Sequence, residues 1–271
     1  MAEVAELAFA RVSKTREGNL VWVRLPPSAC SSICRDGPNW TPDLAYAVGL
    51  IATDGNLSVD GRHINLTSSD TEQIENFKKC LSTKANPCRN PPGSFTKRQS
   101  YRLQAGNKVL YQQLQAIGLS PRKTGSLQAL AIPDNFFRDF FRGVIDGDGS
   151  IILYTDRYNV YKGTRYEYLR MYVTVTSASL PFLEWILASV QKALSVRGYI
   201  VGQPPRPRFV MPTWKLRFAK QASIRIARWI YYSRDIPCLL RKRILAERAL
   251  QTFETFQDKR TKAWRYRHGR I

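Results

Sequence analysis

The stretch TPDLAYAVGLIATDG, residues 41–55, has the features of an apolar helix with defined ends. Thr41 is a good N-cap, and Pro42 suits the first helical position because it has no N–H to leave unpaired. The residues that follow are apolar on much of the helix circumference until Asp54-Gly55 ends the run. A glycine in mid-helix, Gly49, allows another backbone to approach closely. The stretch therefore predicts a buried helix with a closely packed neighbour.

A second copy of this pattern, PDNFFRDFFRGVIDGDG, occupies residues 133–149. It is also apolar, carries Gly143 in mid-helix and ends at Asp148-Gly149. The segments after the two copies match in order. Each copy predicts a hairpin with period-two alternation, a helix, a second hairpin, another helix and a basic turn. In the first copy these are about 57–66, 71–81, 94–105, 107–117 and 118–123; in the second, 151–175, 180–195, 199–218, 221–232 and 236–242.

The duplication predicts an α+β fold of two pseudo-symmetric αββαββα halves. We place the first half at 38–132 and the second at 133–258. Residues 1–37 form an N-terminal extension, and 259–271 form a basic C-terminal tail. Five cysteines without zinc-ligand spacing indicate reduced thiols, hence a cytoplasmic protein, or one of an organelle matrix if the gene is organellar.

Positive charge dominates the composition. The 271 residues include 42 Lys and Arg against 21 Asp and Glu, a formal net charge of +21, and residues 135–271 carry 26 of the basic groups but only 10 acidic ones. Such an excess favours a polyanionic partner, nucleic acid first. A membrane surface is the rival partner, but it would call for a basic amphipathic helix or a lipidation signal, and neither is evident. No apolar run is long enough to span a bilayer.

Asp54 and Asp148 each follow the C-terminal end of an apolar helix. Backbone carbonyls make that end negative, so a carboxylate there is unfavourable unless a cation joins it. If the two helices pack at Gly49 and Gly143, the carboxylates converge and can share Mg²⁺, which prefers hard oxygen ligands. Metals held in this way hydrolyse phosphodiesters. One Asp-Gly alone would favour a plain C-cap turn; two on matched helices favour the metal site.

The segments 47–55 and 141–149 resemble the two signature helices of LAGLIDADG homing endonucleases. The resemblance covers about residues 38–250 and implies the single-chain, double-motif form. In that form the antiparallel sheets of both halves make a DNA-binding saddle, joined at the paired helices. It implies a monomer that binds a double-stranded DNA target, with no obligate protein partner and no membrane.

The resemblance also implies roles for single residues. Asp54 and Asp148 bind two or three Mg²⁺ ions, with Mn²⁺ or Ca²⁺ able to substitute in binding, and Thr53 and Gly147 contribute to the metal site. Gly49 and Gly143 form the helix interface. Lys123 and Lys242 lie near the scissile phosphates, although solvated basic turns are an alternative interpretation. The remaining motif positions are Arg142, which replaces a small residue, the packing or capping pair Ala52 and Asp146, and the hairpin-end residues Ser68 and Ser177, which can hold ordered water.

Two β-ribbons in each half can enter the major groove of DNA, and most of their contacts should go to phosphates. In the first half the candidates are Asn56, Ser58, Arg62, His63, Asn65, Lys97, Arg98 and Arg102. In the second half they are Tyr154, Arg157, Arg165, Tyr168, Arg170, Arg206, Arg208, Lys215 and Arg217. Tyr168, like Tyr166, has an alternative interpretation as a core residue.

The function expected from these residues and the resemblance is a site-specific, metal-dependent double-strand DNA homing endonuclease that leaves short 3′ overhangs. We expect an intron host, because the chain begins at Met1 and lacks the splicing blocks of an intein. The alternatives are an RNA maturase or a non-cleaving DNA-binding regulator of the same fold. A ribosome- or membrane-associated basic protein would explain the charge but not the duplicated Asp-Gly helix ends.

Overall fold

The computed structural model describes residues 38–90, 99–161, 164–204 and 211–253, with the backbone alone at 158–161 and 164–167. All of these residues belong to one compact unit, Asp36–Ile271. The extension 1–37, the tail 259–271 and four expected DNA contacts lie outside the described residues, as does the side chain of Arg165. The four contacts are Lys97, Arg98, Arg206 and Arg208.

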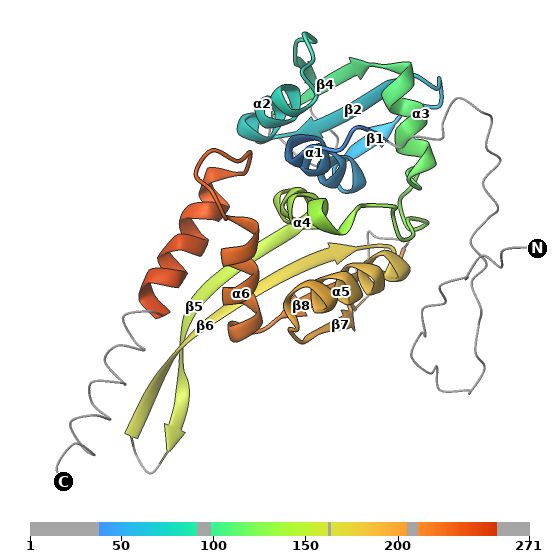
Figure 1. The fold of residues 1–271 in the computed structure, drawn as a ribbon. Coiled ribbons are helices and arrows are strands. Elements are labelled where there is room, and N and C mark those ends of the chain that lie inside the picture. Colours follow the sequence, from blue (N-terminus) through green and yellow to red (C-terminus); the bar gives the residue numbers. More distant parts are fainter. Residues whose placement is uncertain (1–37, 91–98, 162–163, 205–210, 254–271) are drawn as a thin grey trace, which may run out of the picture. The chain divides into compact units, whose positions relative to one another are not determined.

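The first half has the predicted order of elements (Figure 1). The Thr41 hydroxyl caps the first helix by accepting a bond from the Leu44 N–H at 3.1 Å. The strands form an antiparallel sheet in the order β1-β2-β4-β3. The elements are α1 (Pro42–Ala52), β1 (Gly55–Leu57), β2 (His63–Ser68), α2 (Thr71–Cys80), β3 (Cys88–Asn90), β4 (Ser100–Gly106) and α3 (Lys108–Ala116).

The second half repeats this topology, with the sheet order β5-β6-β8-β7. Its first hairpin is much longer than that of the first half, since β5 and β6 have 13 and 14 residues against 3 and 6 in β1 and β2. The elements are η1 (Asp134–Phe136), α4 (Phe137–Asp146), β5 (Gly149–Tyr161), β6 (Thr164–Ser177), α5 (Leu180–Leu194), β7 (Gly198–Gly202), β8 (Trp214–Phe218) and α6 (Lys220–Ile230).

The structure corrects two boundaries. The second hairpin of the first half begins at β3, well before the predicted residue 94. None of the three β3 side chains is buried, so no hydrophobic alternation in the sequence marks this strand. The predicted basic turn at 236–242 is in part a helix, which begins at Leu240 and continues to the end of the described chain at Phe253. This C-terminal helix packs on the core through Ala246, Ala249 and Phe253.

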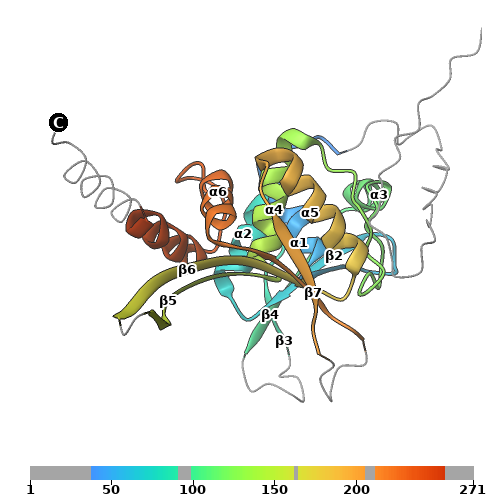
Figure 2. The ribbon, with the colours of Figure 1, turned by 90° about the horizontal axis from the view of Figure 1, so that it is seen from below.

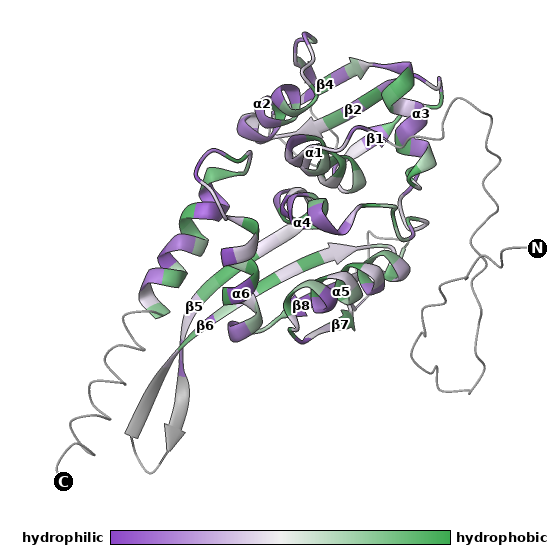
Figure 3. Cartoon of the chain, viewed as in Figure 1, coloured by the Kyte–Doolittle hydropathy of each residue, from purple (hydrophilic) through white to green (hydrophobic). Residues whose placement is uncertain are grey.

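One hydrophobic core runs through both halves. The sheets contribute alternate strand residues, Ile64 and Leu66 from β2 and Val173 and Val175 from β6, and Figure 3 shows hydrophilic and hydrophobic residues mixed along such strands. In Figure 2 the strands of both sheets lie on one side of α1, α4 and α5. Each sheet therefore has one face against the helices and one face turned away from them. None of the described helices is long and apolar enough to cross a membrane.

Candidate active site

Helices α1 and α4 pack through their two glycines. A Cβ atom added at Gly49 would lie 2.8 Å from the Gly143 Cα and closer still to the Phe140 carbonyl oxygen. A Cβ at Gly143 would lie 3.0 Å from the Gly49 Cα. Backbone therefore touches backbone, and only glycine fits at either position. The two helices run close together along this contact, with α1 above α4 in Figure 1.

The two helix ends are also brought together. Thr53 and Gly147 cap α1 and α4 with similar backbone angles, φ −97° and ψ −88° against φ −74° and ψ −97°. Their N–H groups donate to the carbonyls of Gly49 and Gly143 at 3.3 and 3.0 Å. A side chain at Gly147 would collide with the Thr53 hydroxyl, so these caps touch across the interface. Each aspartate follows its cap directly, which places Asp54 and Asp148 as neighbours.

The pKa of Asp148 reflects the same proximity of the two carboxylates. Both carboxylates have solvent-exposed surface. The pKa of Asp148 is nevertheless raised to about 6, first because surrounding protein displaces water and second because the negative Asp54 lies nearby. Lys123 and Lys242 oppose this rise. Loss of water and the nearby Asp54 charge therefore both disfavour the ionised form of Asp148, and a cation bound beside the two carboxylates would stabilise that form.

Lys123 and Lys242 occupy equivalent places beside the carboxylates. They are only 8% and 7% exposed, so the alternative interpretation of solvated turns is wrong. The Lys123 ammonium donates to the Gly55 carbonyl at 2.6 Å, and the Lys242 ammonium donates to the Gly149 carbonyl at 2.8 Å. Burial lowers the pKa of each lysine to about 8, while the charges of Asp54 and Asp148 act to raise it.

Thr53 is already engaged at the end of α1. Its hydroxyl donates to the carbonyls of Gly49 and Leu50 at 3.0 and 3.1 Å. Its carbonyl accepts a long bond of 3.4 Å from Lys123. A carbonyl oxygen has two lone pairs, so a metal bound to Thr53 would share that oxygen with the lysine.

Sequence reasoning missed Gln73, which lies on α2 and is 3% exposed. Its amide Nε2 donates to the Asp54 Oδ2 at 2.9 Å, and its Oε1 accepts from the Ser68 hydroxyl at 2.6 Å. Ser68 therefore orients a side chain that holds the aspartate. In the second half, the Ser177 hydroxyl accepts from the Ser179 N–H at 3.1 Å. No sequence signal identifies Gln73, because its direction depends on how α2 packs.

The donor set fits a hard divalent cation. Asp54 and Asp148 supply carboxylate oxygens at two negative helix ends, and Mg²⁺ is commonly held by one or two carboxylates with water and substrate phosphate completing its shell. Over the described ranges no group of three or more His, Cys, Asp and Glu side chains comes together. An all-protein cage of such side chains is therefore not formed there, and a metal would depend on the aspartate pair.

Asp146 and Arg142 are buried on α4 and hold polar contacts to other elements. The buried Asp146 carboxylate accepts from the Tyr46 hydroxyl at 3.0 Å and from the Leu239 N–H at 2.8 Å, at the start of the C-terminal helix. Burial raises the pKa of Asp146 to about 6. Arg142 is fully buried, pairs with Asp139 at 2.7 Å and donates to the carbonyls of Ile230 and Pro237.

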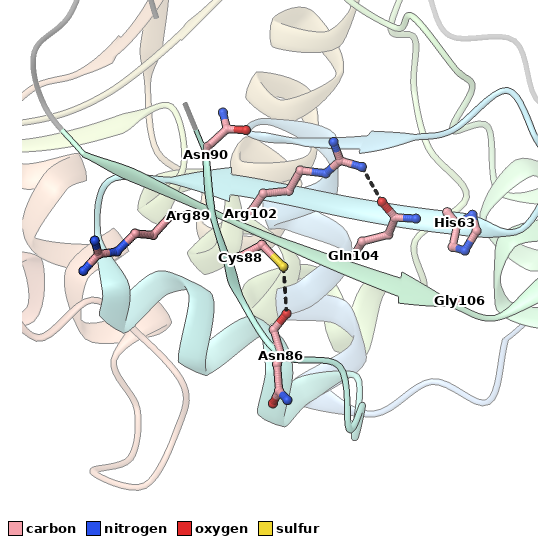
Figure 4. A pocket seen from close by; sticks show the side chains of 8 residues that line it. All are labelled: His63, Asn86, Cys88, Arg89, Asn90, Arg102, Gln104 and Gly106. Atoms are coloured by element: carbon pink, nitrogen blue, oxygen red, sulfur yellow. Dashed lines mark hydrogen bonds between the residues drawn. The ribbon is translucent and has the colours of Figure 1, made fainter. Parts of the chain in front are cut away.

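The outer face of the first sheet is rich in amides. Asn56, Asn65 and Gln104 lie side by side on β1, β2 and β4, on the face opposite the buried Ile64 and Leu66. Of the expected contacts, Asn56, Arg62 and Arg102 are exposed, and the Ser58 hydroxyl accepts from the Asn65 amide at 2.7 Å. Figure 4 shows the groove of about 530 Å³ on this sheet, lined by His63, Asn86, Cys88, Arg89, Asn90, Arg102, Gln104 and Gly106.

His63 and Arg102 already have partners on that face. The His63 Nδ1 contacts the Asp60 carboxylate, and the bond lowers the pKa of Asp60 to about 2. The Asp60 carboxylate therefore explains the orientation of the His63 imidazole, and no bound metal is needed to explain it. Arg102 donates to the Gln104 side-chain oxygen, as drawn in Figure 4. An arginine held by a neighbouring amide has a restricted orientation, which suits a defined contact with a base edge or phosphate.

The outer face of the second sheet is aromatic and basic. Tyr154 and Tyr168 are 45% and 47% exposed, so the core alternative is wrong for Tyr168. The Arg170 guanidinium pairs with Asp156 at 3.0 Å, and the Arg217 guanidinium lies 3.8 Å from the Tyr172 ring centroid. Arg157 is exposed, whereas Lys215 is partly buried and pairs with Thr176 in the ladder. The two sheets thus share a topology but present different chemistry.

Comparisons with known proteins bear on the fold. No protein-family model and no curated protein sequence matches the chain. Among solved structures, the I-LtrWI LAGLIDADG homing endonuclease bound to target DNA is similar, with a TM-score of 0.51 and 12% identity over 80% of this chain and 91% of that chain. Full-length DUF199/WhiA from Thermatoga maritima has a TM-score of 0.48 and 15% identity, over 85% and 70%. A mesophilic variant of the homing endonuclease I-DmoI has a TM-score of 0.45 and 14% identity, over 71% and 96%.

The similarity to I-LtrWI extends over both halves of the molecule, and it agrees with the two motif helices and the repeated antiparallel sheets. At 12% identity, this similarity supports the fold alone. The chain has the fold of the LAGLIDADG homing endonucleases, with both halves of that fold in one polypeptide.

Proposed function

We propose that this protein is a site-specific, divalent-metal-dependent endonuclease that cuts both strands of a DNA target. The observation that carries the proposal is the convergence of Asp54 and Asp148 at the paired ends of α1 and α4, flanked by Lys123 and Lys242. Paired carboxylates beside two lysines, in a protein of net charge +21, match the needs of phosphodiester hydrolysis.

Mg²⁺ bound between the aspartates would supply Lewis acidity and activate water for attack on the phosphodiester. The two lysines are mostly protonated at neutral pH, because each pKa is about 8. Their fixed positions let them stabilise negative charge that develops on the phosphate. The outer faces of the sheets would bind the duplex on either side of this site. We further propose that the protein acts as a monomer and is encoded within an intron.

The test is cleavage of a plasmid that carries the target, found by selection from a randomised DNA library or at the intron-less junction of a host gene. With Mg²⁺, Asp54→Asn and Asp148→Asn should each reduce cutting by at least about 100-fold while duplex binding persists, because only the carboxylate charge is lost. Asp134→Asn is the matched control, since Asp134 precedes the opposite end of α4 and pairs with the exposed Lys192. Undiminished cutting by both active-site variants would overturn the metal site.

Binding without Mg²⁺ separates an RNA maturase from the proposed nuclease, whereas a non-cleaving DNA-binding regulator would bind the duplex and leave it uncut when Mg²⁺ is added. A nuclease should prefer the DNA duplex over structured intron RNA of equal length. The buried lysines also donate to the carbonyls of Gly55 and Gly149, the first residues of β1 and β5, and so stabilise the fold. A pure binding protein would retain that role. Tighter binding to RNA, with no cutting of any duplex, would favour the maturase.

A further inference from the structure

Gln73 is held in a defined orientation next to Asp54. It occupies the third position of α2, after the N-cap Asp70, whose side chain accepts from the Glu72 N–H at 3.2 Å. A Gln at this position commonly folds back to bind the N–H of the N-cap residue. Here the Ser68 hydroxyl binds the Asp70 N–H instead, at 3.0 Å. The Gln73 amide is thereby left to reach Asp54.

The same hydroxyl also fixes which way the amide faces. Ser68 donates to the Gln73 Oε1, so the Nε2 group must point to the Asp54 carboxylate. With only 3% of Gln73 exposed, water competes little for these bonds. The result is a chain of three side chains, Ser68, Gln73 and Asp54, that restricts one carboxylate oxygen.

The second half has the same local backbone but lacks this chain. Ser177 ends β6 and binds the N–H of the N-cap residue Ser179, as Ser68 does for Asp70. The third position of α5, however, is Phe182, which is 1% exposed and packs against Trp185. Among the described residues no side chain donates a hydrogen bond to Asp148. The two aspartates of the pair are therefore supported unequally.

We propose that Gln73 is a positioning residue for Asp54, and that its replacement by Phe182 in the second half makes the two strands of the DNA target unequal in cleavage rate. This inference rests on the proposed nuclease function. Residues that orient metal ligands typically affect metal affinity or activity by about 10–100-fold when removed. Removing the Gln73 amide should therefore slow the strand that depends on Asp54 far more than the other.

The experiment measures cleavage of both strands of a linear target duplex, each strand labelled at its own 5′ end, with wild type and Gln73→Leu. Leucine keeps most of the side-chain volume but cannot donate to Asp54. We expect one strand to slow at least about 10-fold and the other less than about threefold, so that duplex cut in a single strand accumulates. Gln191→Leu, the same substitution at an exposed position of α5, is the control and should leave the ratio of the two rates unchanged.

A second readout does not depend on cutting. Calorimetric titration of Ca²⁺ into the protein bound to its target duplex should show one class of ion weakened about 10-fold in Gln73→Leu. Ser68→Ala keeps the Gln73 side chain and removes only its orientation, so it should shift both readouts in the same direction by a smaller factor. This variant replaces Gln73→Leu in the test if thermal unfolding shows that the leucine variant does not fold.

Equal slowing of both strands, or no change in either rate or in Ca²⁺ affinity, would overturn the role of Gln73. That outcome leaves the nuclease proposal standing, since the wild type would still cut. Failure of the wild type to cut any duplex with Mg²⁺ would instead overturn the nuclease proposal itself. Whether the wild type cuts the duplex distinguishes the two results.

Discussion

The contact between α1 and α4 makes a strong prediction for Gly49→Ala. The new Cβ would lie 2.8 Å from both the Gly143 Cα and the Val144 N, and closer to the Phe140 carbonyl oxygen. All three are backbone atoms of α4, so no side chain can rotate away. The helices would have to separate by about 1 Å, and a gap of that size forfeits a quarter to a half of the dispersion energy of the atoms involved.

The expected loss in free energy of unfolding is about 3 kcal/mol, the upper end of the range for overpacked cores, because the obstacle is backbone. For a domain of this size it corresponds to a fall in Tm of about 6–12 °C. The separation also moves Asp54 away from Asp148, and a displacement of about 1 Å at reacting groups can cost 100-fold in rate. Cleavage should therefore fall more steeply than the folded fraction does.

The assay pairs urea unfolding with cleavage of the target plasmid. Gly106→Ala is the control for stability, since its Cβ would meet only the His63 ring at an ordinary 3.5 Å. It should stay within about 1 kcal/mol of wild type. A Gly49→Ala variant that loses less than about 1 kcal/mol, or no more than the control, would refute the close helix contact.

Three further outcomes follow from the described contacts. Because the pKa of Lys242 is lowered to about 8 from 10.5, Lys242 binds more protons in the unfolded chain between these values, so its contribution to the free energy of unfolding should rise as pH increases from 8 to 10.5. Lys242→Met should flatten that rise in urea titrations at pH 7.5 and 10. Arg142→Met removes the buried ion-pair partner of Asp139, which keeps only the Tyr232 hydroxyl and the more distant Arg138, and should cost about 3 kcal/mol in urea unfolding. Asp139→Asn should recover part of this loss in the double variant, and a double variant no more stable than the single would contradict the ion-pair reasoning. On DNA, Lys215→Ala should weaken binding to all duplexes and lower the salt slope by about 1, while Gln104→Ala should relax base preference in a library selection; identical profiles for the two would count against distinct roles.

The different outer faces of the sheets also bear on target recognition. The outer face of the first sheet carries a row of amides, of which Asn56 and Gln104 are exposed, while Asn65 between them is buried and donates to Ser58. Amide side chains can make paired hydrogen bonds with adenine. At the matching ladder positions the second sheet has Ser150, Thr174 and Arg217, and Arg217 lies against Tyr172. Under the proposed function, the two halves of the DNA target should therefore differ in base composition, although the protein repeats its own fold.

Much of the fold could be predicted from the chain because the signals are local. The N-cap Thr41, the mid-helix glycines Gly49 and Gly143, and the two Asp-Gly ends are all visible in single segments. Their duplication is sufficient to infer a pseudo-symmetric pairing of the two helices. One such pairing brings the two glycines into contact and places the two Asp-Gly ends side by side. Alternation along β2 and β6 predicts the inner and outer faces of the sheets for the same reason.

The rest depended on contacts between segments far apart in the chain. Whether Lys123 and Lys242 are buried, or whether Arg142 points inward, is decided by the elements that cover them. Gln73 is the clearest case: its sequence position indicates a helix start, and only the packing of α2 beside α1 turns its amide to Asp54.

The residue types and the spacing of apolar residues along the chain therefore determined the paired helices, the two sheets and the acidic pair of this protein. The tertiary structure alone decided which polar groups lose their water and which partners they gain. The physical reason is that hydrogen bonds and pKa values depend on distance and burial in three dimensions, and a linear pattern records neither.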